Sequence, residues 1–241
     1  MSAQLIALCF DASDPLGLAC FWAEALRWEV DETSDAIGLV PSDDTTFRIV
    51  FRPVLETKAG RNRIHLDLTT TSVEDQNESV AKLIERGARH IDIGQGLDEP
   101  HVVLADPEGN ELCLIEPENS FLAGCGRLGA LSCDGSRQVG YFWSAALGWP
   151  LVWDQDDETA IRAPGDTGPF ITWGGGPELP KIGQNRLRLD VAPPATGDQD
   201  AEVDRLGSLG AKHVDIDHDG PVTWVVMSDP DGNEFCVFSP R

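Results

Sequence analysis

The chain repeats itself at a constant offset of 123 residues. Residues 58–117 align without a gap to residues 181–240, and 24 of the 60 aligned positions are identical. Two earlier pairs of segments align as well, namely ALCFD (7–11) with ALSCD (130–134) and FWAEALRW (21–28) with FWSAALGW (142–149). Similarity of this kind is the mark of a duplicated structural unit. The sequence therefore predicts two homologous domains, at residues 1–118 and 125–241.

Both halves show the same predicted order of elements. Strands are expected where apolar residues alternate or run together between turn residues, and helices where they recur every three or four positions. In the first half the predicted helices are 15–27 and 73–86, and the predicted strands are 5–11, 36–40, 47–51, 63–69, 89–93, 101–105 and 110–115. This order is β-α-β-β followed by β-α-β-β-β, which suggests two βαβββ units per half with one strand undetected.

These units predict an α+β fold class. We expect a tandem repeat of two domains, each built from paired βαβββ units that form a curved mixed sheet. The helices would cover the outer face of each sheet and leave the inner face as a cup.

The chain is strongly acidic, with 41 Asp and Glu residues against 18 Lys and Arg residues and a formal net charge of −23. This charge would repel phosphate backbones and anionic membrane surfaces, so we expect no nucleic acid and no membrane partner. The six cysteines form no CxxC pair, and the first residues lack the features of a signal peptide. We therefore expect a cytoplasmic protein with reduced cysteines, a monomer or a homodimer, whose partner is a small-molecule ligand.

The segments FWAEALRW, HLDL and DPEGN, in this order, resemble the vicinal oxygen chelate superfamily of glyoxalases, bleomycin-resistance proteins and dioxygenases. The GNEFC text of the last strand is similar to the glyoxalase-like branch. The resemblance implies a cup that holds a ligand and, in the enzymes, a divalent metal. It also implies three ligand positions: a His or Gln on the first strand, a His that opens the fifth strand, and a Glu four residues after the Gly of the turn.

Most of these ligand positions carry other residues in this chain. The first-strand, fifth-strand and post-turn positions are Ala7, His65 and Cys113 in the first half. The same three positions are Ala130, Arg188 and Cys236 in the second half. Alanine offers no ligand atom, and arginine is permanently cationic. We therefore expect neither the divalent metal typical of these enzymes nor any other cofactor. A divalent metal in domain 1 stays open as an alternative, with His65 and Glu111 as candidate ligands.

Strand alternation predicts which side chains face the cup. In RIHLDLT the apolar residues Ile64, Leu66 and Leu68 would face the helices, so that His65 and Asp67 face the cup. By the same rule, the other cup-facing residues are Glu111, Cys113, Arg188, Asp190, Glu234 and Cys236, and His101 aligns with Trp224 near the cup. Each cup would then hold two carboxylates and one nitrogenous side chain.

These residues suit acid–base chemistry or ligand binding. A carboxylate in an apolar cup has a raised pKa and can act as a base, with a histidine to shuttle the proton, so Glu111 and His65 are the catalytic candidates. The candidate ligand contacts are Asp67, His101, Cys113, Arg188, Asp190, Trp224, Glu234 and Cys236.

Structural roles compete with these functional ones. Arg188, Asp190 and Glu234 could form a buried ion-pair network. The two aspartates could bond to the preceding Asn-Arg segments, and His65 could be a structural histidine. Both cysteines could pack as small apolar residues.

The function predicted is a glyoxalase/bleomycin-resistance-like protein that binds a small organic molecule in the concave cavity of its sheet, without the usual divalent metal. The alternative is a lyase or isomerase of the same superfamily that acts on a small carbonyl or natural-product substrate, with Glu111 or His65 as base. A third alternative is an accessory protein whose cups are filled by side chains and whose surface binds a partner. Whether the chain is an enzyme stays open at this point.

Overall fold

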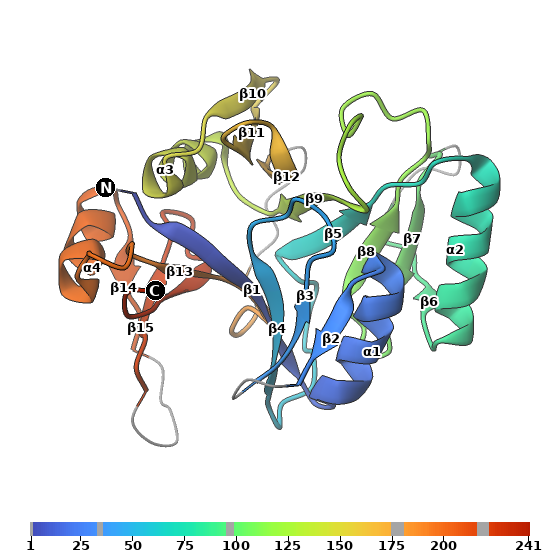
Figure 1. The fold of residues 1–241 in the computed structure, drawn as a ribbon, viewed down its shortest axis with the longest axis horizontal. Helices are drawn as coiled ribbons and strands as arrows, with labels where there is room; N and C mark the ends of the chain where they lie inside the picture. The colour runs from blue at the N-terminus through green and yellow to red at the C-terminus, as the bar shows by residue number, and fades with distance from the viewer. Residues whose placement is uncertain (1, 33–35, 95–98, 175–180, 216–221) are drawn as a thin grey trace.

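The computed structural model describes residues 2–32, 36–94, 99–174, 181–215 and 222–241, which form four successive βαβββ units (Figure 1). Unit 1 contains β1 (Gln4–Ala12), α1 (Pro15–Leu26), β2 (Glu29–Asp31), β3 (Ile37–Val40) and β4 (Arg48–Pro53). Unit 2 contains β5 (Ile64–Leu68), α2 (Val73–Glu85), β6 (Arg89–His90), β7 (Val102–Ala105) and β8 (Glu111–Leu114). Unit 3 contains β9 (Leu128–Cys133), α3 (Arg137–Leu147), β10 (Leu151–Gln155), β11 (Glu158–Ala163) and β12 (Thr167–Trp173). Unit 4 contains β13 (Leu187–Ala192), α4 (Gln199–Ser208), β14 (Lys212–His213), β15 (Val225–Ser228) and β16 (Glu234–Val237).

The strand that the sequence left undetected in the first unit is β2. Its three residues, EVD, are mostly polar, and it lies at the edge of its sheet. Short, charged edge strands carry little of the alternation on which strand prediction depends. The other predicted elements of the first half are present, with their ends shifted by a few residues at most.

The four units pair into two eight-stranded mixed sheets, which confirms the predicted α+β class. The β1/β13 sheet has the strand order β14-β15-β16-β13-β1-β4-β3-β2, and the β5/β9 sheet has the order β10-β11-β12-β9-β5-β8-β7-β6. Units 1 and 4 form the first sheet, and units 2 and 3 form the second. The joins are the antiparallel ladders of β1 with β13 and of β5 with β9. Each sheet therefore takes one unit from each sequence half, so a half and a sheet do not coincide.

Helices α2, α3 and α4 lie at the rim of the molecule, whereas α1 lies between strands β2–β4 and α2 (Figure 1). Helices α1 and α4 contact strands of the β1/β13 sheet, and α2 and α3 contact strands of the β5/β9 sheet. The start of α1 is set locally, because the Asp14 side chain accepts the Gly17 N–H and Pro15 occupies the first helical position. Among the described residues, no helix is long and apolar enough to cross a membrane.

The repeated segments DPEGN and DPDGN form the turns between β7 and β8 and between β15 and β16. In the first turn, the Asp106 carboxylate accepts the Asn110 N–H at 2.8 Å and the indole Nε1–H of Trp22 at 3.0 Å. In the second, Trp143 donates to Asp229 at 3.3 Å. A buried Trp–Asp hydrogen bond thus joins a helix to a turn of the same sequence half. This bond gives one physical reason for the recurrence of both motifs.

Alternate residues of the strands face the helices and form one core that is shared by both sheets. Ile64, Leu66 and Leu68 of β5 belong to this core, as strand alternation predicted. The opposite side of each sheet is called the open face below. His65 and Asp67 lie on the open face of the β5/β9 sheet.

Candidate functional site

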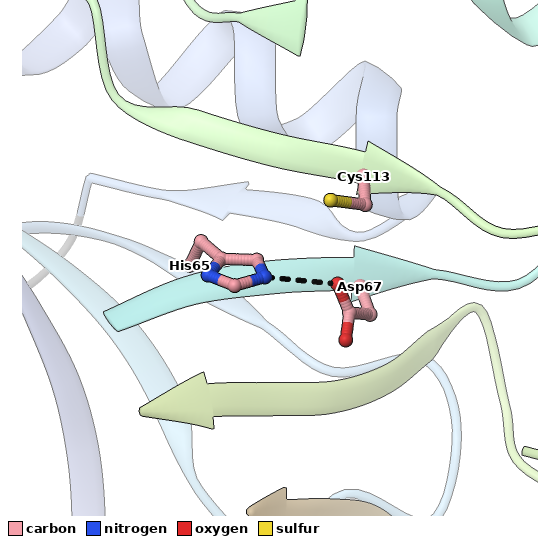
Figure 2. A group of neighbouring side chains, drawn as sticks. All are labelled: His65, Asp67 and Cys113. Carbon is pink, nitrogen blue, oxygen red and sulfur yellow. Dashed lines mark ion pairs between the residues drawn. The ribbon is translucent and has the colours of Figure 1, made fainter. Parts of the chain in front are cut away.

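A histidine, an aspartate and a cysteine meet on the open face of the β5/β9 sheet. His65 and Asp67 come from β5, and Cys113 comes from the adjacent parallel strand β8, where it pairs with Asp67 in register. Figure 2 shows the imidazole of His65 turned toward the Asp67 carboxylate, with the Cys113 thiol on the neighbouring strand. His65 Nε2 lies 3.4 Å from Asp67 Oδ1, and one potential ligand atom from each residue lies within 4.8 Å of the others.

The His65–Asp67 ion pair and burial determine the protonation states of this cluster. Burial opposes the ionisation of His65, yet its pKa lies well above the ordinary value because Asp67 faces the ring. The pKa of Asp67 is lowered, since His65 outweighs the opposing effect of burial and the Ser132 hydroxyl donates to Oδ2 at 2.6 Å. Burial raises the pKa of the Cys113 thiol. The cluster therefore consists of an imidazolium, a carboxylate and a neutral thiol.

Apolar side chains fill the space around this cluster. Cys113 belongs to a buried apolar group with Leu122 and Phe170. The ring of Phe121 stacks on Phe170 at 4.7 Å between centroids and meets Trp153 edge-on at 5.8 Å. Phe121 and Leu122 come from the segment that connects β8 to β9. That connection therefore packs onto the open face of the β5/β9 sheet.

The two glutamates predicted for the cups are engaged elsewhere. Glu111 accepts a hydrogen bond from Lys58 Nζ at 2.5 Å and one from the Asn62 N–H at 3.2 Å. Glu234 repeats this arrangement with Lys181 and with the Asn185 N–H. The Asn-Arg segments therefore bind the glutamates, whereas the sequence suggested the aspartates as their partners.

The open face of the β1/β13 sheet carries an arginine stacked on an aromatic pair. Arg52 Nη2 lies 2.7 Å from Asp190 Oδ2. Its guanidinium carbon is 4.9 Å from the centre of the Trp224 ring and 5.2 Å from that of Phe238, and the two rings lie 5.5 Å apart. Burial raises the pKa of Asp190 to about 6, against the opposing charges of Arg52 and Arg188. Arg52 is thus held by one carboxylate and by two aromatic faces.

Arg188 has a different partner from the one that the sequence suggested. Its guanidinium forms two hydrogen bonds of 2.6 Å to the two carboxylate oxygens of Asp11 and a third to the Asn185 carbonyl. Within the described residues it forms no ion pair with Asp190 or Glu234. The alternative in which these three residues pair with one another was therefore wrong, although each of them is in an ion pair with another residue. The partner was not visible from sequence because Asp11 is 177 positions away in the chain.

A cavity of about 1690 Å³ lies over the open face of the β1/β13 sheet. The predicted residues Arg188, Asp190, Trp224 and Cys236 all line it. His101, the counterpart of Trp224, lies instead on the other sheet, with its Nδ1 3.9 Å from a Glu99 carboxylate oxygen.

The sequence interpretation missed Arg48, Arg52 and Asp11, which also line the cavity. The signal was present for the two arginines. In the strand RIVFRP, Ile49 and Phe51 belong to the core shared with the helices, so strand alternation alone turns Arg48 and Arg52 to the open face.

The two open faces differ in whether they fit the divalent metal that the resemblance implies. On the β1/β13 sheet the ligand positions carry Ala7, Arg188 and Cys236, and this set does not fit a metal. On the β5/β9 sheet, His65, Asp67 and Cys113 offer one nitrogen, one oxygen and one sulfur. Such a mixed set suits zinc, although a metal would have to displace the protons on His65 and Cys113.

The chain is similar to known proteins in sequence pattern and in fold. A family model described as a glyoxalase-like domain matches residues 7–115 and, a second time, residues 130–238. No curated protein matches the chain. Among solved structures, the chain resembles glyoxalase I from Zea mays at 12% identity and a TM-score of 0.60, over 99% of this chain and 92% of that one. It also resembles a provisionally assigned dioxygenase from Bacillus subtilis at 13% identity and a TM-score of 0.57, over 99% and 86% of the two chains. At such identities the likeness shows the fold alone.

Proposed function

The chain belongs to the glyoxalase-like domain family, within the vicinal oxygen chelate fold, and from this premise we propose that it binds a small organic molecule without a metal. The proposed site is the cavity over the open face of the β1/β13 sheet. Cavities in proteins that take small molecules are commonly about 300–1000 Å³, so this one has room for a ligand together with bound water.

The observation that carries the proposal is the composition of the cavity floor. Ala7 has no atom that could ligate a metal, and the Arg188 guanidinium is held by Asp11. Burial raises the pKa of the Cys236 thiol to about 11. A thiol with that pKa stays protonated near neutral pH and is a poor metal ligand. Trp224 and Phe238, on which Arg52 stacks, add aromatic surface beside these groups. Shape and apolar contact therefore support binding better than metal-assisted chemistry at this site.

The carboxylates of the cavity floor support the same proposal. Asp11 is held by Arg188 and Asp190 by Arg52, both at ion-pair distances of 2.7 Å or less. A general base must reach the proton that it abstracts, and both oxygens of Asp11 and the Oδ2 of Asp190 already accept hydrogen bonds from guanidinium groups. Binding needs no such group.

The test uses N-phenyl-1-naphthylamine, an uncharged dye whose emission rises in apolar surroundings. We expect saturable binding that is unchanged after dialysis against EDTA. Trp224→Ala should weaken this binding, because it removes part of this aromatic surface. The matched control is Trp153→Ala on the other open face, which should leave the affinity unchanged. An absence of saturable binding, or its loss after metal removal, would overturn the proposal.

The second candidate function is a lyase or isomerase that acts on the open face of the β5/β9 sheet. The observation that favours it is the group of His65, Asp67 and Cys113, which would hold a divalent metal. A bound metal would supply a Lewis acid that polarises a substrate carbonyl. With a metal held by His65, Glu111 is the candidate base, although it is paired with Lys58. Without a metal, His65 would have to lose its proton before it could act as the base.

Elemental analysis of the purified protein tests this second candidate. A stoichiometric Zn, Ni, Fe or Mn content that is lost in His65→Ala would support it. A metal-free protein that takes up no added Zn²⁺ would eliminate a metal-dependent reaction at this site.

A further inference from the structure

The cavity over the β1/β13 sheet concentrates the positive charge of a strongly acidic chain. Within the described residues, nine of the 18 Lys and Arg residues line it, against four of the 36 Asp and Glu residues. Three of these cations come from strands: Arg48, Arg52 and Arg188. Six come from connecting segments and the C-terminus: Lys58, Arg61, Arg63, Lys181, Arg186 and Arg241. A concave wall with this bias attracts anions, in a chain whose surface otherwise repels them.

Ion pairs do not consume all of these cations. Arg61, Arg63 and Arg241 have no ion pair with any carboxylate in the described part of the chain, whereas the other six do. Arg52 gives its Nη2 to Asp190, but a guanidinium carries five N–H donors, so one ion pair does not exhaust it.

Buried donors on the cavity wall lack partners. Arg63 Nε, Asn185 Nδ2 and Arg186 Nε are buried and make no hydrogen bond within the described ranges. The Asn185 residue as a whole is only 7% exposed. Buried polar atoms in native proteins are satisfied by protein, water or ligand, so these three donors still require an acceptor at the cavity wall. Among the side-chain acceptors of the described wall residues, one, Asp190 Oδ1, is buried without a hydrogen bond.

The unpartnered donors come from the repeated Asn-Arg segments of the two halves. Arg63 and Arg186 occupy equivalent positions, 123 residues apart, and both face the same cavity. The backbone N–H groups of Asn62 and Asn185 are already bonded to Glu111 and Glu234. Arg186 is held by the Glu108 carboxylate and the Glu56 carbonyl, whereas Arg63 forms no ion pair within the described residues and remains available to an acidic group.

The other open face lacks this arrangement. Arg188 and Trp224 are replaced there by His65 and His101 at the equivalent positions. The strand partner of Ala7 is Arg48, whereas the strand partner of the equivalent Ala130 is Phe170. The same fold therefore carries cations on one open face and apolar residues on the other. The charge of the cavity is not a requirement of the fold.

We infer that the molecule bound in the β1/β13 cavity is an organic anion, with a carboxylate, sulfonate or phosphate group on an apolar body. This inference rests on the function proposed above. The apolar body packs beside Trp224 and Phe238, on which Arg52 is stacked. The acidic group accepts from Arg63 and Arg241, the cavity arginines whose guanidinium groups form no ion pair within the described residues and whose substitution is tested below.

Two dyes with the same ring system test this inference. 8-Anilinonaphthalene-1-sulfonate carries a sulfonate, and N-phenyl-1-naphthylamine is its uncharged counterpart. We expect the sulfonate to bind the wild-type protein at least about tenfold more tightly, since a charge-assisted hydrogen bond is commonly worth that factor. Added NaCl should weaken the binding of the sulfonate and leave that of the uncharged dye unchanged.

Arg63→Met should weaken sulfonate binding about tenfold, with no effect on the uncharged dye. Arg241→Met serves as a second variant, because this terminal side chain makes no ion pair within the described residues. The matched control is Arg86→Met, which makes the same charge change at the C-cap of α2, outside the cavity lining. Circular dichroism would verify that each variant is folded.

The outcomes separate the inference from the proposed function. If both dyes bind with equal affinity, or if neither cavity variant weakens the sulfonate more than Arg86→Met does, the anion inference is overturned while cavity binding stands. If neither dye binds at all, the proposed function fails and the anion inference fails with it.

Discussion

Asp190 should make the stability of this protein fall as the pH rises from 5 to 7.5. The carboxyl is 2% exposed, and burial raises its folded-state pKa from the ordinary value of 3.8 to about 6. Arg52, Arg188, Cys236 and Asp11 are the charged or titratable groups that face it. A raised acid pKa means that the folded state favours the protonated form. The stability that Asp190 contributes is therefore fully present below pH 3.8 and is lost as the pH rises through 6.

The size of this effect follows from the two pKa values. One pKa unit corresponds to about 1.4 kcal/mol, so complete ionisation of Asp190 lowers the free energy of unfolding by about 3 kcal/mol at pH 7.5. At pH 5 the folded-state carboxyl is still protonated while the unfolded one is ionised, and the loss is about half as large. Between these two pH values we therefore expect a change of roughly 1.4 kcal/mol.

The variant Asp190→Asn isolates this contribution because an amide does not titrate. Urea unfolding followed by tryptophan emission would give the free energy of unfolding of both proteins at pH 5 and pH 7.5. Losing the Asp190 charge beside Arg52 shifts the stability of the variant by a constant amount, which cancels when the two pH values are compared. The difference in free energy of unfolding, variant minus wild type, should therefore be larger at pH 7.5 than at pH 5 by roughly 1.4 kcal/mol. An identical difference at both pH values, or one of opposite sign, would refute the argument from burial.

Three further predictions concern binding and packing. The affinity of wild-type protein for 8-anilinonaphthalene-1-sulfonate should rise severalfold from pH 7.5 to pH 5 as Asp190 loses its charge, and titration of Asp190→Asn with the same dye should show no such rise. Trp22→Phe should lower the free energy of unfolding by about 1–3 kcal/mol in urea, because it removes one of the two hydrogen bonds to Oδ2 of the buried Asp106; an unchanged midpoint would contradict a structural role for this bond. Lys58→Met should lower the free energy of unfolding by about 3 kcal/mol, since it leaves the buried Glu111 carboxylate without an ion-pair partner. The double variant Lys58→Met/Glu111→Gln should be less destabilised than Lys58→Met, which would verify that cause.

Strand alternation was enough to place several candidate residues on the correct face. His65, Asp67 and Cys113 gather on one side of the β5/β9 sheet because successive side chains of a strand point to opposite faces. This property is local, so it can be read from five residues of sequence. The same rule applied to RIVFRP would also have placed Arg48 and Arg52, which the first interpretation overlooked.

Partners that lie far apart in the chain could not be predicted in this way. Asp11 and Arg188 are 177 positions apart, and Arg52 and Asp190 are 138 apart. The pairing of carboxylates with arginines depends on which of the four units share a sheet. The duplication predicts that the units pair, but it does not predict which units pair with each other. The sequence of each half is equally compatible with a sheet formed by the two units of that half. Only the ladders of β1 with β13 and of β5 with β9 decide the question.

The exchange of units between the halves allows the two open faces to acquire separate specificities. If two identical copies of one half met around a twofold axis, both faces would be alike, and any substitution would appear on both at once. Within a single chain, each position of a face is encoded once. One face could therefore gather arginines while its counterpart accepted Phe121 and Leu122 from the connecting segment. A single gene thus holds two recognition surfaces that selection can alter independently.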